Sequence, residues 1–171
     1  MLTPKAIATM TKDYRTPEDT VEVWAGRAYL PSLNKCINDL GRTRVENALK
    51  LYLIQLNMAT NPARPLNEEI IDTMVPPILD HIIEDLNTSI TTADLRIVFD
   101  RAMRGFYGKM YGGFGCQDVC DWFSQYDEEK MEAIDRYEER RKQGDYCGSR
   151  SESFDAARFH EIYVDYINGR I

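Results

Sequence analysis

Apolar side chains recur along this chain at spacings of three and four residues, the spacing of one face of an α-helix. The clearest run predicts a helix from about Arg42 to Met58. Its inward-facing positions are Val45, Ala48, Leu49, Tyr52, Leu53 and Leu56. Strand-like alternation is hard to find. The pattern therefore predicts an all-α fold, a compact multi-helix domain.

Capping residues divide the first third of the chain into short helices. Threonine followed by proline occurs at Thr3 and at Thr16, where the hydroxyl would cap a helix whose first residue is proline. Pro31 begins a further helical stretch that Gly41 ends. We therefore expect three short helices before the long run that begins near Arg42.

Two further helices are predicted in the middle of the chain. Asn67 caps the first, and its apolar stripe continues across Pro76 and Pro77 as far as Leu86. Proline removes a helical hydrogen bond, so this stripe indicates a kinked helix or two short helices on one axis. Thr91 or Thr92 caps the next helix.

The last third predicts one long helix and a separate tail. A helix of more than twenty residues is predicted to begin at Cys116; its first half has an apolar face and its second half consists mostly of charged residues. The charged half either projects into solvent or acts as a docking arm. Residues 144–153 have the composition of a linker, and the residues after them have one apolar face. The predicted organisation is a helical domain at 1–143, a linker at 144–153 and a C-terminal amphipathic helix at 154–171.

Composition narrows the kind of partner. The chain has 171 residues, with 21 Lys and Arg against 28 Asp and Glu, a formal net charge of −7. Non-specific binding to nucleic acid requires an excess of positive side chains that neutralise phosphates, and this chain is acidic. We therefore expect direct nucleic-acid binding to be weak or absent, and we expect the partner to be a protein. The first fifteen residues lack the apolar core of a signal peptide, and no stretch is long and apolar enough to predict a membrane span. Four cysteines are few for a disulfide-bonded scaffold, so we expect them to be reduced thiols. We expect a cytoplasmic protein.

The stretch 105–115, GFYGKMYGGFG, holds five glycines, two tyrosines and two phenylalanines. It does not match a phosphate-binding loop, because Gly108-Lys109 is followed by Met110 rather than by serine or threonine. Glycines permit the backbone angles that end one helix and begin the next, with Gly105 well placed to end the helix before it. We interpret the stretch as a helix–helix connection whose exposed aromatics double as a contact surface. A stacking platform for single-stranded nucleic acid stays the alternative.

No pattern in the chain indicates catalysis or a metal. His81 and His160 are the only histidines, and no motif ties either of them to a nucleophile. Cys116 and Cys120 are four residues apart but would need two more ligands to bind zinc. Asp118 is explained by capping the helix that follows it. We therefore expect no enzymatic activity, no cofactor and no metal.

The stretch from Thr91 to Arg140 resembles a family of small all-helical proteins carried by bacterial phages and conjugative elements. The shared pattern has an Asp near a helix start, then G-x-Y-G-x-x-Y, then a helix that ends in a tyrosine and a Glu-Arg pair. The matching residues are Asp94, Gly105, Tyr107, Gly108, Tyr111, Trp122, Tyr126, Glu139 and Arg140. This chain departs from the pattern at one point. The family usually has an Asp soon after the second tyrosine of the motif, whereas here the first acidic residue after that tyrosine is Asp118.

The resemblance implies a replication accessory protein, a non-enzymatic adaptor that binds a replicative helicase or its loader ATPase. Arg, Tyr and Trp contribute a large share of the binding energy at protein interfaces, and we chose the predicted contact residues on this basis. They are Arg101, Arg104, Tyr107, Lys109, Tyr111, Trp122 and Tyr126. The alternative is an inhibitor of a host defence or nucleic-acid enzyme, with an acidic surface at Glu128, Glu129 and Glu132 that imitates phosphates. Homo-oligomerisation is left open.

Overall fold

The fold is all-α, as predicted. The computed structural model describes residues 14–25, 30–110, 112–142, 163–165 and 168. Within these ranges there is no strand, and only one isolated antiparallel bridge joins Ser32 to Thr91. The helices are α2 (Pro17–Ala25), α3 (Leu33–Leu40), α4 (Arg42–Thr60), α5 (Glu68–Asp80), the π-helical turn η1 (His81–Asp85), α6 (Thr92–Met103) and α7 (Cys116–Lys142).

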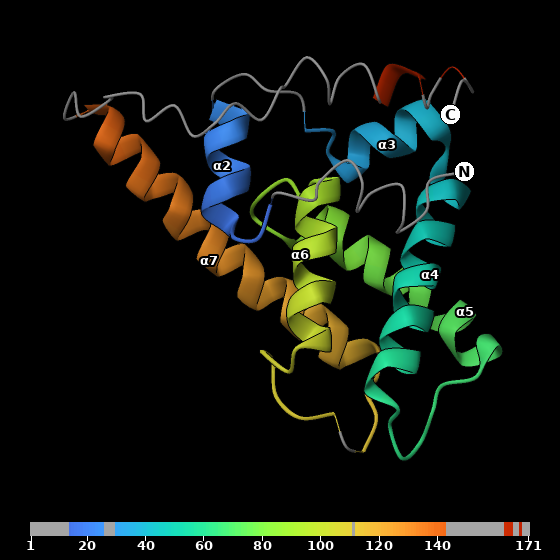
Figure 1. Cartoon of the computed structure of the whole chain (residues 1–171). Coiled ribbons are helices and arrows are strands. Elements are labelled where there is room, and N and C mark those ends of the chain that lie inside the picture. Colours follow the sequence, from blue (N-terminus) through green and yellow to red (C-terminus); the bar gives the residue numbers. More distant parts are fainter. Residues whose placement is uncertain (1–13, 26–29, 111, 143–162, 166–167, 169–171) are drawn as a thin grey trace.

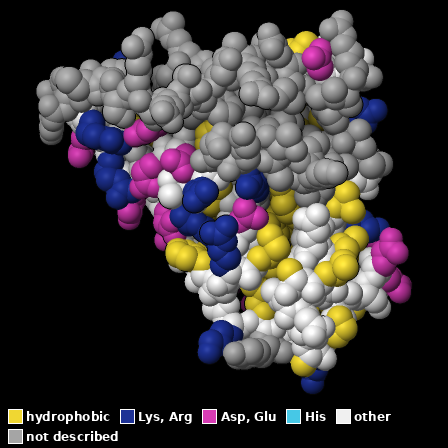
Figure 2. All heavy atoms as spheres, in the orientation of Figure 1, with side chains coloured by type: hydrophobic (Ala, Val, Ile, Leu, Met, Phe, Trp, Pro, Cys, Tyr) yellow, Lys and Arg dark blue, Asp and Glu magenta, His cyan; other side chains and the backbone are white. Residues whose placement is uncertain are grey.

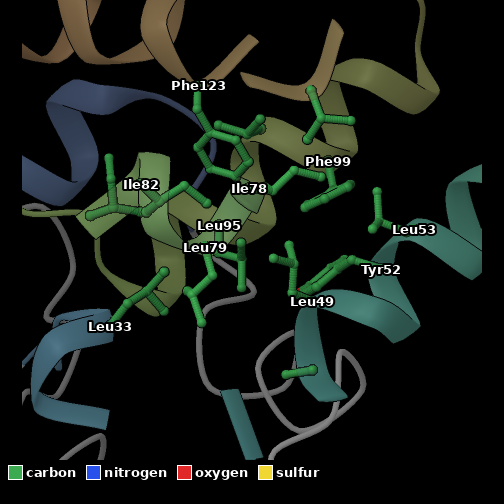
Figure 3. Packing of buried hydrophobic residues seen from close by; sticks show 14 of the residues in the cluster. Leu33, Leu49, Tyr52, Leu53, Ile78, Leu79, Ile82, Leu95, Phe99 and Phe123 are labelled. Atoms are coloured by element: carbon green, nitrogen blue, oxygen red, sulfur yellow. The ribbon is translucent and has the colours of Figure 1, made fainter. Parts of the chain in front are cut away.

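The core lies between α4, α5, α6 and the first half of α7 (Figure 1). Side chains from these four helices converge in the close view of Figure 3. The Tyr52 ring stacks on Phe99 with centroids 4.9 Å apart, and Phe99 meets Phe123 edge to face at 6.0 Å. The apolar positions predicted for the helix of residues 42–58 are all buried. These contacts make one continuous core.

The predicted helix caps are present where the structure describes them. Thr16 and Asp19 exchange hydrogen bonds at the start of α2, and the Asn67 side chain accepts from the Ile70 amide at 2.8 Å. Thr91, rather than Thr92, caps α6, and Asp94 completes a capping box with it. The helix start expected at Thr3 lies outside the described residues.

The Pro76–Pro77 pair stays inside one continuous helix. Both prolines lie on the exposed side of α5, where water reaches the carbonyls that lose their helical donors. The irregularity comes immediately after α5, as the π-helical turn at His81. The structure thus has a single α5 that runs through the prolines and widens at η1.

The charged second half of α7 is partly covered. Helix α2 packs along it, and Ala133 is buried beneath. Two ion pairs join the helices at their surface, Glu18 with Arg136 at 2.5 Å and Glu22 with Arg140 at 3.6 Å. The long helix therefore serves as a docking surface for a segment of its own chain.

The C-terminal tail contacts the domain at Tyr163. Residues 163–165 are helical, and the Tyr163 ring is buried in the main core. Its hydroxyl donates to Asp39 of α3 at 2.9 Å. The rest of the predicted C-terminal helix and the whole predicted linker lie outside the described residues. No helix in the described part of the chain is long and apolar enough to cross a membrane.

Candidate interaction surface

The connection between α6 and α7 begins with a glycine-terminated helix end. The Gly105 amide donates to the Ala102 carbonyl at 2.9 Å, and the Phe106 amide donates to the Arg101 carbonyl at 3.0 Å. With φ of 76° at Gly105, this is a Schellman motif. The predicted role of Gly105 as the residue that ends α6 is confirmed.

The rest of the connection is held at two points. A Cβ added to Gly113 would lie 3.2 Å from the Arg64 carbonyl, so the connection runs directly against the α4–α5 loop. The Asp118 carboxylate accepts from the Gly115 amide at 2.7 Å and caps the start of α7, as predicted. Gly113 therefore lies against the α4–α5 loop, and Gly115 is held at the start of α7.

The aromatic side chains of this region divide into core and surface. Trp122 is buried, with Tyr107 stacked on it at 5.7 Å and Phe114 tilted against it at 5.8 Å. Burial raises the pKa of Tyr107 to about 12, although the nearby Arg101 acts to lower it. Phe106 is different, because 55% of it is exposed.

Two of the predicted contact residues therefore require correction. Trp122 and Tyr126 are core residues in this structure, and their side chains offer no surface to a partner. Their spacing marks the inner face of α7, which a pattern of aromatic residues alone does not distinguish from a contact face. Tyr111 lies outside the described residues.

Arg101 links the exposed ring to α7. Its guanidinium lies 4.8 Å from the Phe106 ring centre and 5.5 Å from that of Tyr126. The same guanidinium pairs with Glu129 at 2.6 Å. Arg101 therefore positions Phe106, and Glu129 is occupied by an internal ion pair. Arg104 and Lys109 are exposed on either side of Phe106 in the sequence.

A buried polar cluster behind this surface was not predicted. Lys130 donates to Asp94 at 2.6 Å and to the Ser89 carbonyl at 2.7 Å, and the Tyr126 hydroxyl donates to Asp94 at 2.5 Å. Burial alone would raise the pKa of Asp94, but Lys130 and the hydrogen bonds outweigh it, and the net pKa is lowered. The cluster ties α7 to the start of α6.

A second link lies between η1 and α7. His81 contacts Asp85 at 2.9 Å through Nδ1 and Ser124 at 3.0 Å through Nε2. An acid, a histidine and a serine linked in this way have the connectivity of a hydrolytic triad. No sequence motif predicts the link, because Ser124 is distant from His81 in the chain. Ser124 lies mid-helix, where the backbone amides serve the helix and cannot form an oxyanion hole. We interpret the link as a structural contact.

The three cysteines that the structure describes form no metal site with the described residues around them. Cys36, Cys116 and Cys120 are free thiols, and no cluster of metal-ligating side chains occurs among the residues that the structure describes. Burial and the adjacent Cys116 raise the pKa of Cys120 to about 12. His160 and Cys147 lie outside the described residues.

Exposed acids do gather on one face of α7. At 100° per residue, four of them fall within a narrow stripe. They are Glu128, Glu132, Asp135 and Glu139, and no ion pair joins them to another described residue. Two of the three acids predicted for an acidic surface therefore lie on one exposed face, whereas Glu129 is paired.

Comparison with known proteins gives no match. No protein-family model, curated protein or solved structure matches this chain. The resemblance to phage and conjugative-element proteins over residues 91–140 therefore stays a prediction. The functional argument rests on the chain's own surface.

Proposed function

We propose that this protein is a non-enzymatic, cytoplasmic adaptor of a phage or mobile element that binds a partner protein through the α6–α7 connection. A replicative helicase or its loader ATPase is the partner that the resemblance favours. The observation that carries the proposal is Phe106, a large apolar side chain that is exposed while its backbone amide is hydrogen-bonded to the end of α6. Aromatic residues presented in this way are common anchors of protein interfaces.

The surroundings of Phe106 support a preorganised contact. The Schellman motif fixes its backbone, and Arg101, itself held by Glu129, lies against its ring. A side chain already held near its bound position loses less entropy on binding. Neighbouring Arg104 and Lys109 add charge that orients a partner.

Affinity purification from a host lysate tests this function. Tagged wild-type protein, Phe106→Ala and Ile70→Ala are compared after nuclease treatment, and captured proteins are identified by mass spectrometry. Ile70 is also an exposed apolar residue, on α5, and serves as the matched control. We expect a helicase or loader ATPase to be captured by wild type and Ile70→Ala but lost with Phe106→Ala. Equal capture by all three proteins contradicts the proposed surface.

The acidic stripe of α7 favours a second function. Exposed carboxylates in a line can occupy a basic groove of a nucleic-acid enzyme or a defence enzyme. Reversal of Glu128 and Glu132 to lysine would then abolish inhibition, whereas reversal of Glu68, an exposed acid of α5, would not. If the protein inhibits a purified nuclease and the reversal of Glu128 and Glu132 leaves that inhibition unchanged, this function is excluded.

A further inference from the structure

The charges of this acidic protein are unevenly distributed around Phe106. Residues 101–117 contain Arg101, Arg104 and Lys109 and no Asp or Glu, in a chain with 28 acids. The α4–α5 loop that touches the connection adds Arg64, and residues 57–67 also lack acids. The lowest part of the face in Figure 2, at the end where Figure 1 shows the connection, displays dark blue side chains and no magenta.

Two of these cations are available to a partner. Arg64 and Arg104 are exposed, and neither has an ion-pair partner among the residues that the structure describes. Most other described arginines and lysines are paired with acids, including Arg42, Lys50 and Arg136. We name Arg64, Arg104, Phe106 and Lys109 the basic end. Its charge is opposite to that of the whole molecule.

The aromatic content of the basic end separates two classes of ligand. A platform for single-stranded nucleic acid needs successive exposed rings on which bases stack. Of the described aromatics in the connection, Tyr107 is stacked on Trp122 and Phe114 is buried, which leaves Phe106 exposed. One exposed apolar residue on an end of the molecule that carries positive side chains and no acids instead suits a peptide segment with one large apolar side chain between carboxylates.

We propose that the basic end binds an acidic segment of its partner protein, in which Asp or Glu residues flank one large apolar residue. This inference rests on the proposed adaptor function and specifies the chemistry that the α6–α7 connection recognises. The apolar residue packs on the exposed part of Phe106, and the carboxylates pair with Arg64 and Arg104. Such contacts make the association salt-dependent.

Selection from a library of random peptides tests the ligand class. Peptides are selected on the full chain and counter-selected on the Arg64→Glu/Arg104→Glu variant, and the best peptide is measured by fluorescence anisotropy. We expect acidic peptides with a large apolar residue. Their affinity should fall about tenfold or more with Phe106→Ala or Arg104→Glu, and should fall as salt rises. Arg44→Glu reverses an exposed arginine at the start of α4 and should leave the affinity unchanged.

Three outcomes would overturn the inference. Selected peptides that depend on Phe106 but carry no excess of acid would show a different ligand chemistry and leave the adaptor function standing. Tight binding of an oligothymidine probe that Arg104→Glu abolishes would make the basic end a nucleic-acid site. Sedimentation that shows self-association lost in Arg104→Glu would make a second copy the occupant. Circular dichroism of each variant verifies that the helices remain.

Discussion

At the scale of single residues, the buried ion pair of Asp94 with Lys130 is the contact whose disruption should destabilise the fold strongly. The Asp94 carboxylate is fully buried, and it receives hydrogen bonds from Lys130, Tyr126 and Thr91. A buried ion pair contributes little net stability, because desolvation offsets the attraction between its charges. Removing one partner is different, since the other charge is then left buried and alone.

Asp94→Ala should therefore destabilise the protein by about 3–5 kcal/mol, because it leaves the Lys130 ammonium unpaired in the core. Urea unfolding followed by circular dichroism measures the change. The double variant Asp94→Asn/Lys130→Met removes the charge of both residues and should recover much of the loss. A single variant as stable as wild type would show that the pair is not buried in solution.

The lowered pKa of Asp94 also predicts an acid-sensitive stability. The unfolded state binds the proton more readily, so the contribution of Asp94 is complete above the ordinary carboxyl pKa of 3.8 and is lost as pH falls through the lower folded value. Urea unfolding at pH values below about 4 should show a steeper loss of stability in wild type than in Asp94→Asn/Lys130→Met. Parallel curves for the two proteins would contradict the shift.

Phe106 and Phe114 form a matched pair for testing surface against core. Phe106→Ala should change the free energy of unfolding by less than about 0.5 kcal/mol, since 55% of the residue is already exposed to solvent. Phe114→Ala should cost about 3 kcal/mol, because the ring is buried against Trp122. Thermal unfolding of the two variants gives the comparison directly. Equal losses would mean that the connection is packed differently.

Sequence patterns distinguish these residues only in part. The spacing of Val119, Trp122, Phe123 and Tyr126 predicts an apolar face, but not whether the chain's own helices or a partner covers it. Lys130 lies in a run of charged residues that suggests a solvated surface, and its burial depends on Asp94, distant in the sequence. Contacts of this kind come from tertiary packing, which periodicity does not encode.

At the scale of elements, the sequence predicts helix ends correctly where a capping residue marks them, because a cap acts within a few residues. Thr16, Asn67 and Thr91 cap helices through hydrogen bonds to amides three residues ahead, so each cap is visible in the sequence. The end of α6 at Gly105 follows the same logic. The π-helical turn at His81 had no such signal, since its side chain is held by Ser124 of α7.

The glycines of the connection give a prediction at this scale. Gly113→Ala should cost about 1–3 kcal/mol, because alanine is strained at φ of 109° and its Cβ would meet the Arg64 carbonyl at 3.2 Å. Gly112→Ala, one residue earlier, meets nothing within 4 Å and should cost less than about 0.5 kcal/mol. Chemical unfolding of both variants measures the difference. A similar cost at both sites would show that the connection does not rest against the α4–α5 loop.

At the scale of the whole molecule, α7 joins parts of the chain that are far apart in sequence. It contacts α2 along its charged half, and it contacts α5, η1 and α6 along its apolar half (Figure 1). The core it completes also includes Tyr163 from the tail. This continuity predicts that the described helices and the tail residue Tyr163 unfold together.

Tyr163→Ala tests that cooperativity. The residue was expected in a helix after a linker, whereas the structure buries its ring against α3. If the tail is part of the cooperative unit, Tyr163→Ala should lower the free energy of unfolding by about 3 kcal/mol and shift the circular dichroism and tryptophan fluorescence transitions equally. Tyr163→Phe keeps the ring and removes the hydroxyl that donates to Asp39 and contacts the Cys36 sulfur, and it should cost about 1 kcal/mol. A main transition that stays unchanged in Tyr163→Ala would instead make the tail an independent segment, available to bind another molecule.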